Sequence, residues 1–340
     1  MRSGIRASVT LACAIAVIGT ASAAASGPAS SRVVGPRAKV VAKIAIPAGT
    51  GGLTIGEGAV WALSWSKWTL MRIDPRTNVI TARVKVKPAN PCPLAPDTCG
   101  QVAAGNSAVW VSMRPDNVVA RVDPKTTRVT AVIPVGESPD GIATSPGAVW
   151  VANHGTPGSG PSVSRIDPAT NQVVATISVG HSAACCSSHM GVIPGAGSVW
   201  VTVPNGSALV RIDAATNAVT ATITSTERAD QPCGGVAVSE AAVWVAGAHC
   251  GSVIRQIDPR TNRPAGRVTG SVSPINVGLA FGSLWASDLD ARSVLRIDPR
   301  TRKIIGILPV SGIPVLLTAG LGAIWVRDDT GSVLRIAPRR

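Results

Sequence analysis

The stretch GAVWVANHGTPGSGPSVSRIDPATNQVVATISVG, from Gly147 to Gly180, decides the fold of this chain. It holds three short apolar segments, AVWVAN, SVSRID and QVVATISV, which Gly- and Pro-rich turns separate. Together with GIAT, at Gly141–Thr144, they predict four short β-strands. AVWVAN is almost entirely apolar, which indicates a strand that is buried on both faces.

The same unit recurs along the whole chain. A small residue, an aliphatic residue and a tryptophan follow one another at a spacing of 40 to 50 residues, with the tryptophan at Trp61, Trp110, Trp150, Trp200, Trp244, Trp285 and Trp325. This period predicts an all-β fold, a seven-bladed β-propeller with four antiparallel strands in each blade. We expect the seven tryptophan side chains to pack between blades.

A second motif, of the type RIDPATN, recurs at the connection between the third and fourth strand of six copies. Its aspartate caps the turn, its proline fixes φ, and its asparagine adopts the left-handed region. The six turn aspartates are therefore predicted to shape the turns and are excluded from catalytic roles. They are Asp74, Asp123, Asp167, Asp213, Asp258 and Asp298.

The two ends of the repeat region complement each other. The last copy stops after SVLRIAPRR and lacks a fourth strand, whereas VVAKIAIP, at Val40–Pro47, precedes the first copy and resembles VVATISVG at Val173–Gly180. We expect the N-terminal strand to pair beside Leu334 and to complete the last blade. Such closure removes the open sheet edge that favours aggregation.

The residues before the repeats have the composition of processing and linker segments. Residues 1–23 combine Arg2 and Arg6 with a short apolar run and the cleavage-type sequence TASA, which predicts a secretory signal peptide. A lipid anchor at Cys13 is the alternative. Residues 24–37 form a predicted flexible linker and residues 38–340 the propeller, with no predicted membrane span. We therefore expect a secreted or cell-envelope, extracytoplasmic protein.

The phrases VWVAN, RIDPATNQVVATISVG and SPDGIATSPGAVWVAN resemble the YVTN-type propeller repeats of secreted and surface bacterial proteins, across residues 40–338. The resemblance implies a seven-bladed propeller and says little of function. The chain is more distantly similar to propellers of the virginiamycin B lyase type, whose strand tryptophan is followed by a Thr-Glu pair. The corresponding residues of this chain differ from that pair, Ser64, Asn153 and Asp288 among them. The resemblance therefore implies the lyase chemistry only as an alternative.

The fold predicts where a site would lie. The connections between the second and third strands and those between successive blades share one face, here called the mouth, where side chains from several repeats converge. All four histidines fall in these connections, and three aspartates lie beside them. The candidate catalytic residues are His154, His189, His249, Asp140, Asp288 and Asp328, and His181 is a candidate ligand-binding residue.

A further departure from the repeat occurs in WALSWSKWTL, where Trp65 and Trp68 follow the repeated tryptophan of the first copy. Extra aromatic side chains at the mouth are suited to stacking on a sugar ring or on a partner side chain. Trp65, Lys67 and Trp68 are therefore candidate ligand-binding residues.

The six cysteines of the predicted mature chain indicate disulfides, since the chain is predicted to be exported. The candidates are Cys92, Cys99, Cys185, Cys186, Cys233 and Cys250. Cys92 and Cys99 lie in one long connection, which a bridge between them would close. Cys233 and Cys250 flank adjacent strands and are candidates for a bridge. The adjacent Cys185 and Cys186 either form a vicinal disulfide, or one of them pairs with Cys233 instead. The spacing is not that of a compact metal site. No metal site and no cofactor are predicted, and a divalent cation is the alternative.

The formal net charge is +14, and many cations lie beside the RIDPATN-type turns, on the face opposite the mouth. Such a face attracts anionic polymers of a cell envelope. Predicted export and the missing alternation of aromatic and basic residues argue against nucleic acid. The sequence thus predicts a monomeric module that binds an unidentified extracellular ligand or partner, an anionic envelope polymer being one candidate. A lyase or hydrolase with a His/Asp site at the mouth is the alternative.

Overall fold

Every copy of the repeat folds as a four-stranded antiparallel sheet, as predicted. In the third copy the strands are β10 (Pro139–Ser145), β11 (Ala148–Asn153), β12 (Ser162–Asp167) and β13 (Gln172–Ser178). The observed β10 begins two residues before the predicted GIAT strand. A register irregularity between Pro139 and Ile142 causes this difference, since a β-bulge lets Pro139 pair with Asn153.

The computed structural model describes residues 38–47, 51–90, 99–156, 158–180, 189–203, 208–225, 232, 234–247, 251–271 and 273–338. The predicted signal peptide and linker lie outside these ranges. The strands are numbered in chain order, and blades 1 to 7 follow the seven copies.

The remaining elements complete the blades. Blade 1 contains β2 (Leu53–Gly56), β3 (Ala59–Ser64), the 3-10 helix η1 (Trp65–Lys67), β4 (Thr69–Ile73) and β5 (Ile80–Lys85). Blade 2 contains β6 (Val102–Gly105), β7 (Ala108–Met113), the 3-10 helix η2 (Arg114–Asp116), β8 (Val118–Asp123) and β9 (Arg128–Pro134). Blade 4 contains β14 (Val192–Gly195), β15 (Ser198–Val203), β16 (Ala208–Asp213) and β17 (Val219–Thr224). Blade 5 contains β18 (Val236–Val238), β19 (Val243–Ala246), β20 (Ile254–Asp258) and β21 (Arg263–Val268). Blade 6 contains β22 (Pro274–Ala280), β23 (Ser283–Asp288), β24 (Ser293–Ile297) and β25 (Ile304–Pro309). Blade 7 contains β26 (Pro314–Gly320), β27 (Ala323–Asp328), β28 (Ser332–Pro338) and β1 (Ala38–Ala45).

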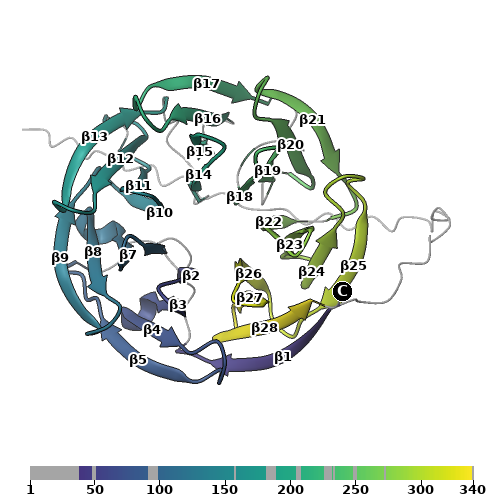
Figure 1. Cartoon of the computed structure of the whole chain (residues 1–340), viewed down its shortest axis with the longest axis horizontal. Coiled ribbons are helices and arrows are strands. Elements are labelled where there is room, and N and C mark those ends of the chain that lie inside the picture. The colour runs from purple at the N-terminus through teal and green to yellow at the C-terminus, as the bar shows by residue number, and fades with distance from the viewer. Residues whose placement is uncertain are drawn as a thin grey trace, which may run out of the picture. The chain divides into compact units, whose positions relative to one another are not determined.

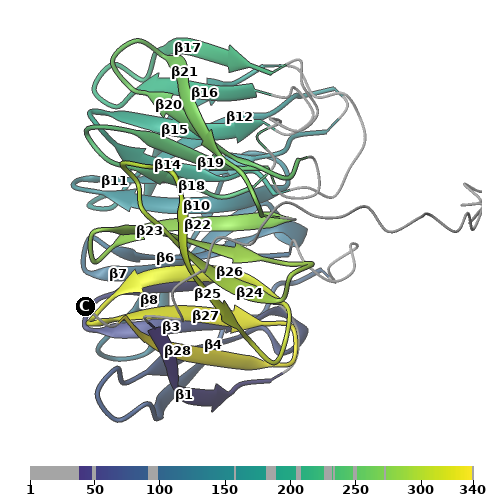
Figure 2. The same cartoon turned by 90° about the vertical axis from the view of Figure 1, so that its right-hand side faces the viewer.

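The blades close into a ring (Figure 1). Innermost strands of successive blades contact one another, from β2 and β6 round to β26 and β2. The predicted closure is confirmed, because β1 pairs antiparallel with β28 and Lys43 lies opposite Leu334. Viewed from the side, the strands of all blades run between two faces of the ring (Figure 2). No helix among the described residues is both long and apolar enough to cross a membrane.

The repeated tryptophans form the core between blades, as predicted. Each of the seven side chains is at most 1% exposed. In blade 2 the indole Nε1 of Trp110 donates a hydrogen bond to Gly105 O at 3.0 Å, and the same bond recurs in blade 7 between Trp325 and Gly320. A buried indole N–H needs such a partner, because an unpaired one would cost the desolvation of a polar group.

The arginine of the third strand joins blades 2, 3, 4 and 7 to the blade that follows each of them in the ring. Arg121 lies over the Trp110 ring at 5.1 Å, a cation–π distance. Its Nη1 donates to Pro168 O at 2.8 Å and to Asn171 Oδ1 at 2.6 Å, both in the turn of blade 3. We call this contact the blade clamp. Arg165 and Arg211 make the same two bonds to the next turn.

Two further junctions show that the clamp is a recurrent contact between blades. Arg335 of blade 7 donates to Asn78 Oδ1 of blade 1 at 3.2 Å, so that the clamp crosses the closure. Between blades 5 and 6 the clamp is reversed, because Gln256 replaces the arginine and Arg302 replaces the asparagine. There Arg302 Nη1 donates to Gln256 Oε1 at 3.2 Å.

The turn aspartates play the predicted role. Asp74 Oδ1 accepts the backbone N–H groups of Arg76 and Thr77 at 2.7 and 3.0 Å, and Asp123 repeats the pattern in blade 2. The bonds from Thr77 and Arg76 hold the pKa of the Asp74 carboxyl below its ordinary value, because they favour the charged form. These carboxylates shape turns on the face opposite the mouth.

Candidate functional site

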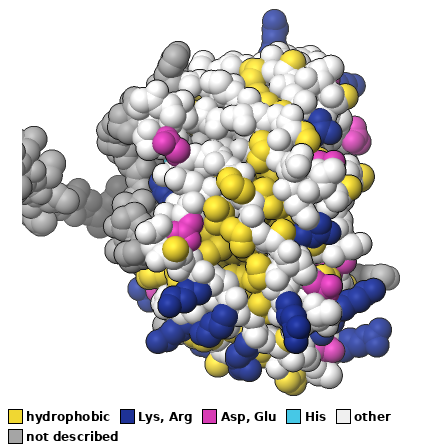
Figure 3. Space-filling view, turned by 90° about the vertical axis from the view of Figure 1, so that its left-hand side faces the viewer, with side chains coloured by type: hydrophobic (Ala, Val, Ile, Leu, Met, Phe, Trp, Pro, Cys, Tyr) yellow, Lys and Arg dark blue, Asp and Glu magenta, His cyan; other side chains and the backbone are white. Residues whose placement is uncertain are grey.

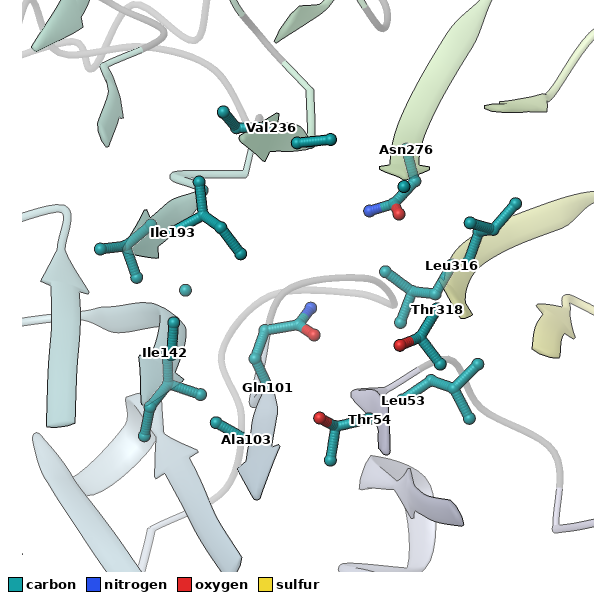
Figure 4. Close-up of a pocket in the computed structure, with 18 of the residues that line it drawn as sticks. Leu53, Thr54, Gln101, Ala103, Ile142, Ile193, Val236, Asn276, Leu316 and Thr318 are labelled. Atoms are coloured by element: carbon teal, nitrogen blue, oxygen red, sulfur yellow. The ribbon is translucent and has the colours of Figure 1, made fainter. Parts of the chain in front are cut away.

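The innermost strands of all seven blades surround a cavity of about 520 Å³ on the axis of the ring (Figure 4). Its wall combines aliphatic side chains with polar side chains and backbone groups, and polar atoms expose slightly more of the wall than apolar atoms do. Among the side chains labelled in Figure 4, the aliphatic ones are Leu53, Ala103, Ile142, Ile193, Val236 and Leu316, and the polar ones are Thr54, Gln101, Asn276 and Thr318.

Asp140 and His189 also line this cavity. Asp140 lies in the bulge at the start of β10, and bulges redirect side chains next to functional sites. His154 follows the end of β11 in the same blade, whereas His189 precedes β14 in the next blade. The structure therefore brings together three of the predicted catalytic residues from two blades.

Asp140 is the centre of this cluster and is completely buried. Its Oδ2 lies 3.1 Å from His154 Nε2, and its Oδ1 lies 3.3 Å from His189 Nδ1. The backbone N–H of Met190 donates a third hydrogen bond to Oδ2 at 2.9 Å. Both carboxylate oxygens are thus paired, as a buried charge requires.

Glycine at position 141 makes this approach of the two blades possible. A Cβ atom at Gly141 would lie 2.2 Å from Met190 O, closer than a carbon and an oxygen can come. The Gly141 N–H instead donates to that carbonyl at 3.1 Å. This contact holds the segment with His189 against the carboxylate of Asp140.

The surroundings fix the charge of the carboxylate. Burial alone raises the pKa of Asp140, because it penalises the charged form. The attraction of His189, together with hydrogen bonds from His154 and His189, outweighs burial and holds the pKa of Asp140 well below its ordinary range. Asp140 is therefore ionised at neutral pH.

Two further residues, neither of them predicted from the sequence, reach this network. Ser112 Oγ donates to Asp140 O at 2.7 Å and so fixes the backbone of the bulge. Burial lowers the pKa of Arg114 in η2, and the Asp140 carboxylate partly offsets that effect. Arg114 follows the second strand of its copy, as His154 does, so its position in the repeat was the available signal.

The pairing determines what His189 can do. Because Asp140 accepts from Nδ1, a neutral His189 carries its proton on Nδ1, and its Nε2 holds the lone pair. An imidazole oriented in this way can accept a hydrogen bond or a proton at Nε2, and the carboxylate stabilises the resulting imidazolium.

The other predicted aspartates cap loops in blades 6 and 7, which are not neighbours of blade 3. Asp288 Oδ1 accepts the N–H groups of Ser273 and Ala291 at 3.1 and 3.2 Å. Asp328 Oδ1 accepts those of Thr330 and Ser332 at 3.1 and 2.9 Å. Neither belongs to the cluster around Asp140.

The extra tryptophans lie in and beside η1, and both are half-buried. Trp68 packs against the hydrophobic cluster that contains Leu63 and Leu70, and its carbonyl accepts the N–H of Val86 at 3.0 Å. Lys67 is exposed. A ligand-binding role of these three residues remains a prediction.

Several predicted residues lie outside the described ranges. They are His181, His249, Cys92, Cys185, Cys186, Cys233 and Cys250. Cys99 is buried and disulfide-bonded, and its predicted pairing with Cys92 stays a prediction. Within the described ranges, no three His, Cys, Asp or Glu side chains are arranged to hold a metal ion.

Comparison with known proteins shows likeness at the level of the fold. No family model and no curated protein matches the chain. The WD40 domain of Pan2 from Neurospora crassa superposes with a TM-score of 0.68 at 9% identity, over 89% of this chain and 96% of that one. Virginiamycin B lyase from Staphylococcus aureus gives 0.68 at 16% identity, over 88% and 99%. A catalytically inactive histidine-to-alanine variant of that lyase, solved with quinupristin, gives 0.67 at 16% identity, over 88% and 99%. The YVTN-type membership therefore stays a prediction.

Proposed function

We propose that this chain is an exported binding module whose ligand enters the axial cavity and contacts His189. The observation that carries the proposal is the buried Asp140 carboxylate, which contacts the imidazoles of His154 and His189 from two adjacent blades. Of the two imidazoles, that of His189 lines the cavity. A ring that needed only packing would not require a buried charge at this place, because burying one is costly.

The composition of the cavity indicates the kind of ligand. Polar and apolar atoms share the exposed wall in nearly equal parts, so the ligand combines an apolar body with several hydrogen-bonding groups. Thr54, Gln101 and Asn276 offer hydrogen bonds from different blades, which orient the ligand. A donor or an acidic group of the ligand would then lie at His189 Nε2.

A lyase or hydrolase is the second candidate, and the Nδ1 contact between His189 and Asp140 favours it. In that case Nε2 of His189 takes a proton from the substrate as a general base, while Asp140 stabilises the imidazolium. The likeness to a lyase propeller is compatible with this candidate but extends to the fold alone.

The experiment that tests both is a screen of the purified chain against quinupristin and soluble envelope polysaccharides, with and without a divalent cation. Calorimetry measures binding, and mass spectrometry of the ligand measures turnover. His189→Gln should weaken binding of any hit about tenfold or more, the loss of a charge-assisted hydrogen bond. If the chain is an enzyme, the same change abolishes turnover.

His154→Gln is the matched variant, because glutamine keeps an N–H donor toward Asp140 at a residue that does not line the cavity. We expect it to leave binding within about threefold of the native value. Equal losses in both variants would contradict a direct role of His189, and no loss in either would contradict the site.

A further inference from the structure

The junction between blades 1 and 2 lacks the blade clamp although both blades carry the turn motif. The turn of blade 2 carries Thr127 where the turns of blades 1, 3, 4 and 5 carry asparagine, and its hydroxyl donates to Thr126 O at 2.7 Å within the turn. Arg72 Nη1 donates to Thr81 Oγ1 of its own blade at 3.0 Å instead. The asparagine Oδ1 that accepts a bond from the clamp arginine at other junctions is therefore missing here, because threonine stands at that position.

A cleft of about 480 Å³ lies at this junction. Its lining residues are Glu57, Arg72, Thr81, Ala82, Pro124, Lys125 and Thr127. Arg72 is half-buried on the blade 1 side, and Lys125 is exposed on the blade 2 side. Two cations of adjacent blades thus line one opening on the turn face of the ring.

The charge of the cleft is positive on balance. Glu57 is its one acidic side chain, and its Oε1 accepts the N–H of Ser107 at 3.1 Å. Lys and Arg side chains also gather on the part of the outer wall that contains β5 (Figure 3). Arg83, next to the lining residue Ala82, and Arg128, next to the lining residue Thr127, are exposed cations beside the cleft. Their combined field raises the local concentration of anions.

We propose that this cleft binds an oxyanion, a carboxylate or a phosphate group, between Arg72 and Lys125. An oxygen of the ligand takes the place that Asn171 Oδ1 takes in front of Arg121. The guanidinium fork matches the oxygens of both groups, and the ammonium adds a second positive charge. The site is separate from the axial cavity and does not depend on the function proposed there.

The test is a titration of the full chain with inorganic phosphate and, separately, with sodium acetate, at constant ionic strength. The ¹H–¹⁵N signal of the Arg72 side chain reports binding at the cleft. We expect a saturable shift in the native chain. Thr127→Asn restores the clamp oxygen and should weaken the binding about tenfold, because the anion then competes with the protein's own acceptor.

Lys125→Gln and Arg260→Gln form the matched pair, since both residues occupy the same turn position and each change removes one charge. Arg260 stands at a clamped junction, where Arg211 already binds Pro259 O and Asn262 Oδ1. Lys125→Gln should weaken binding about threefold, whereas Arg260→Gln should leave it unchanged.

Saturation with either anion supports the site, and the two titrations tell phosphate from carboxylate. A shift that grows without saturation, or equal losses in the two glutamine variants, would overturn the proposal in favour of general attraction to a basic surface. An unchanged affinity in the Thr127→Asn chain would also overturn it.

Discussion

The two faces of the ring are built from different kinds of residue. On the turn face, the turn aspartate and the clamp arginine recur in most copies. The aspartate binds backbone N–H groups of its own turn, and the arginine binds the turn of the next blade. At the mouth, Asp140, His154 and His189 each occur in one copy only. Repetition therefore marks the residues that hold the blades together, and departures from the repeat mark the places where we propose the functional sites.

The largest effect should come from the centre of the mouth cluster. Asp140→Asn leaves N–H groups facing an amide that itself donates, and we expect it to destabilise the fold by about 3 kcal/mol at pH 7. Chemical denaturation measures the change. Asp213→Asn on the turn face is the control, because asparagine keeps the oxygen that accepts the turn N–H groups. A larger loss in the control would reverse the contrast between the two faces.

The stability difference between the native chain and Asp140→Asn should depend on pH. The pKa of Asp140 is lowered in the folded chain, so its contribution to stability is complete above the unfolded value of about 4. This contribution is lost as the pH falls toward and through the lower pKa that Asp140 has in the folded chain. The stability difference between native chain and Asp140→Asn should thus shrink below about pH 4, and a difference that grows there would contradict the ionised carboxylate.

Gly141→Ala should come next, because its Cβ would lie 2.2 Å from Met190 O and must push β10 away from the next blade. We expect a loss of about 2 kcal/mol in thermal or chemical unfolding, together with a weaker contact between Asp140 and His189. Gly158→Ala is the control, since a Cβ at that position meets nothing within 4 Å. Equal stability of the two variants would show that the close approach is not required.

The reversed clamp between blades 5 and 6 allows a smaller test. Gln256→Arg alone places two guanidinium groups against each other, and Arg302→Asn alone leaves Gln256 without its donor. The double variant recreates the clamp of the other junctions. We expect it to recover about 1 kcal/mol relative to the sum of the single changes. Additive losses would show that the clamp is not a paired contact.

Thr127→Asn should have the smallest effect on stability and the opposite sign. It offers Arg72 an acceptor in the next blade and should stabilise the chain by about 0.5 kcal/mol. A calorimetric melting curve at low phosphate measures the gain. A loss of stability would indicate that the junction of blades 1 and 2 cannot adopt the clamp.

Most of the fold followed from the sequence because repetition makes its signals visible. Seven copies of one strand pattern predicted the blades, and the missing fourth strand of the last copy predicted the pairing of β1 with β28. Chain topology also predicted that His154, His189 and Asp140 share one face. What it could not predict is the bulge at Asp140 and the absence of Asp288 and Asp328 from the cluster, because those depend on backbone register and on loop hydrogen bonds.

The most direct test of the mouth as the functional site is a two-bond ¹H–¹⁵N spectrum of histidine-labelled protein, recorded with and without a ligand from the screen. The geometry predicts that His189 carries a proton on Nδ1 and that the ligand shifts its Nε2 signal. A neutral His189 with its proton on Nε2 alone, or a ligand that leaves this imidazole unchanged, would contradict the proposed site.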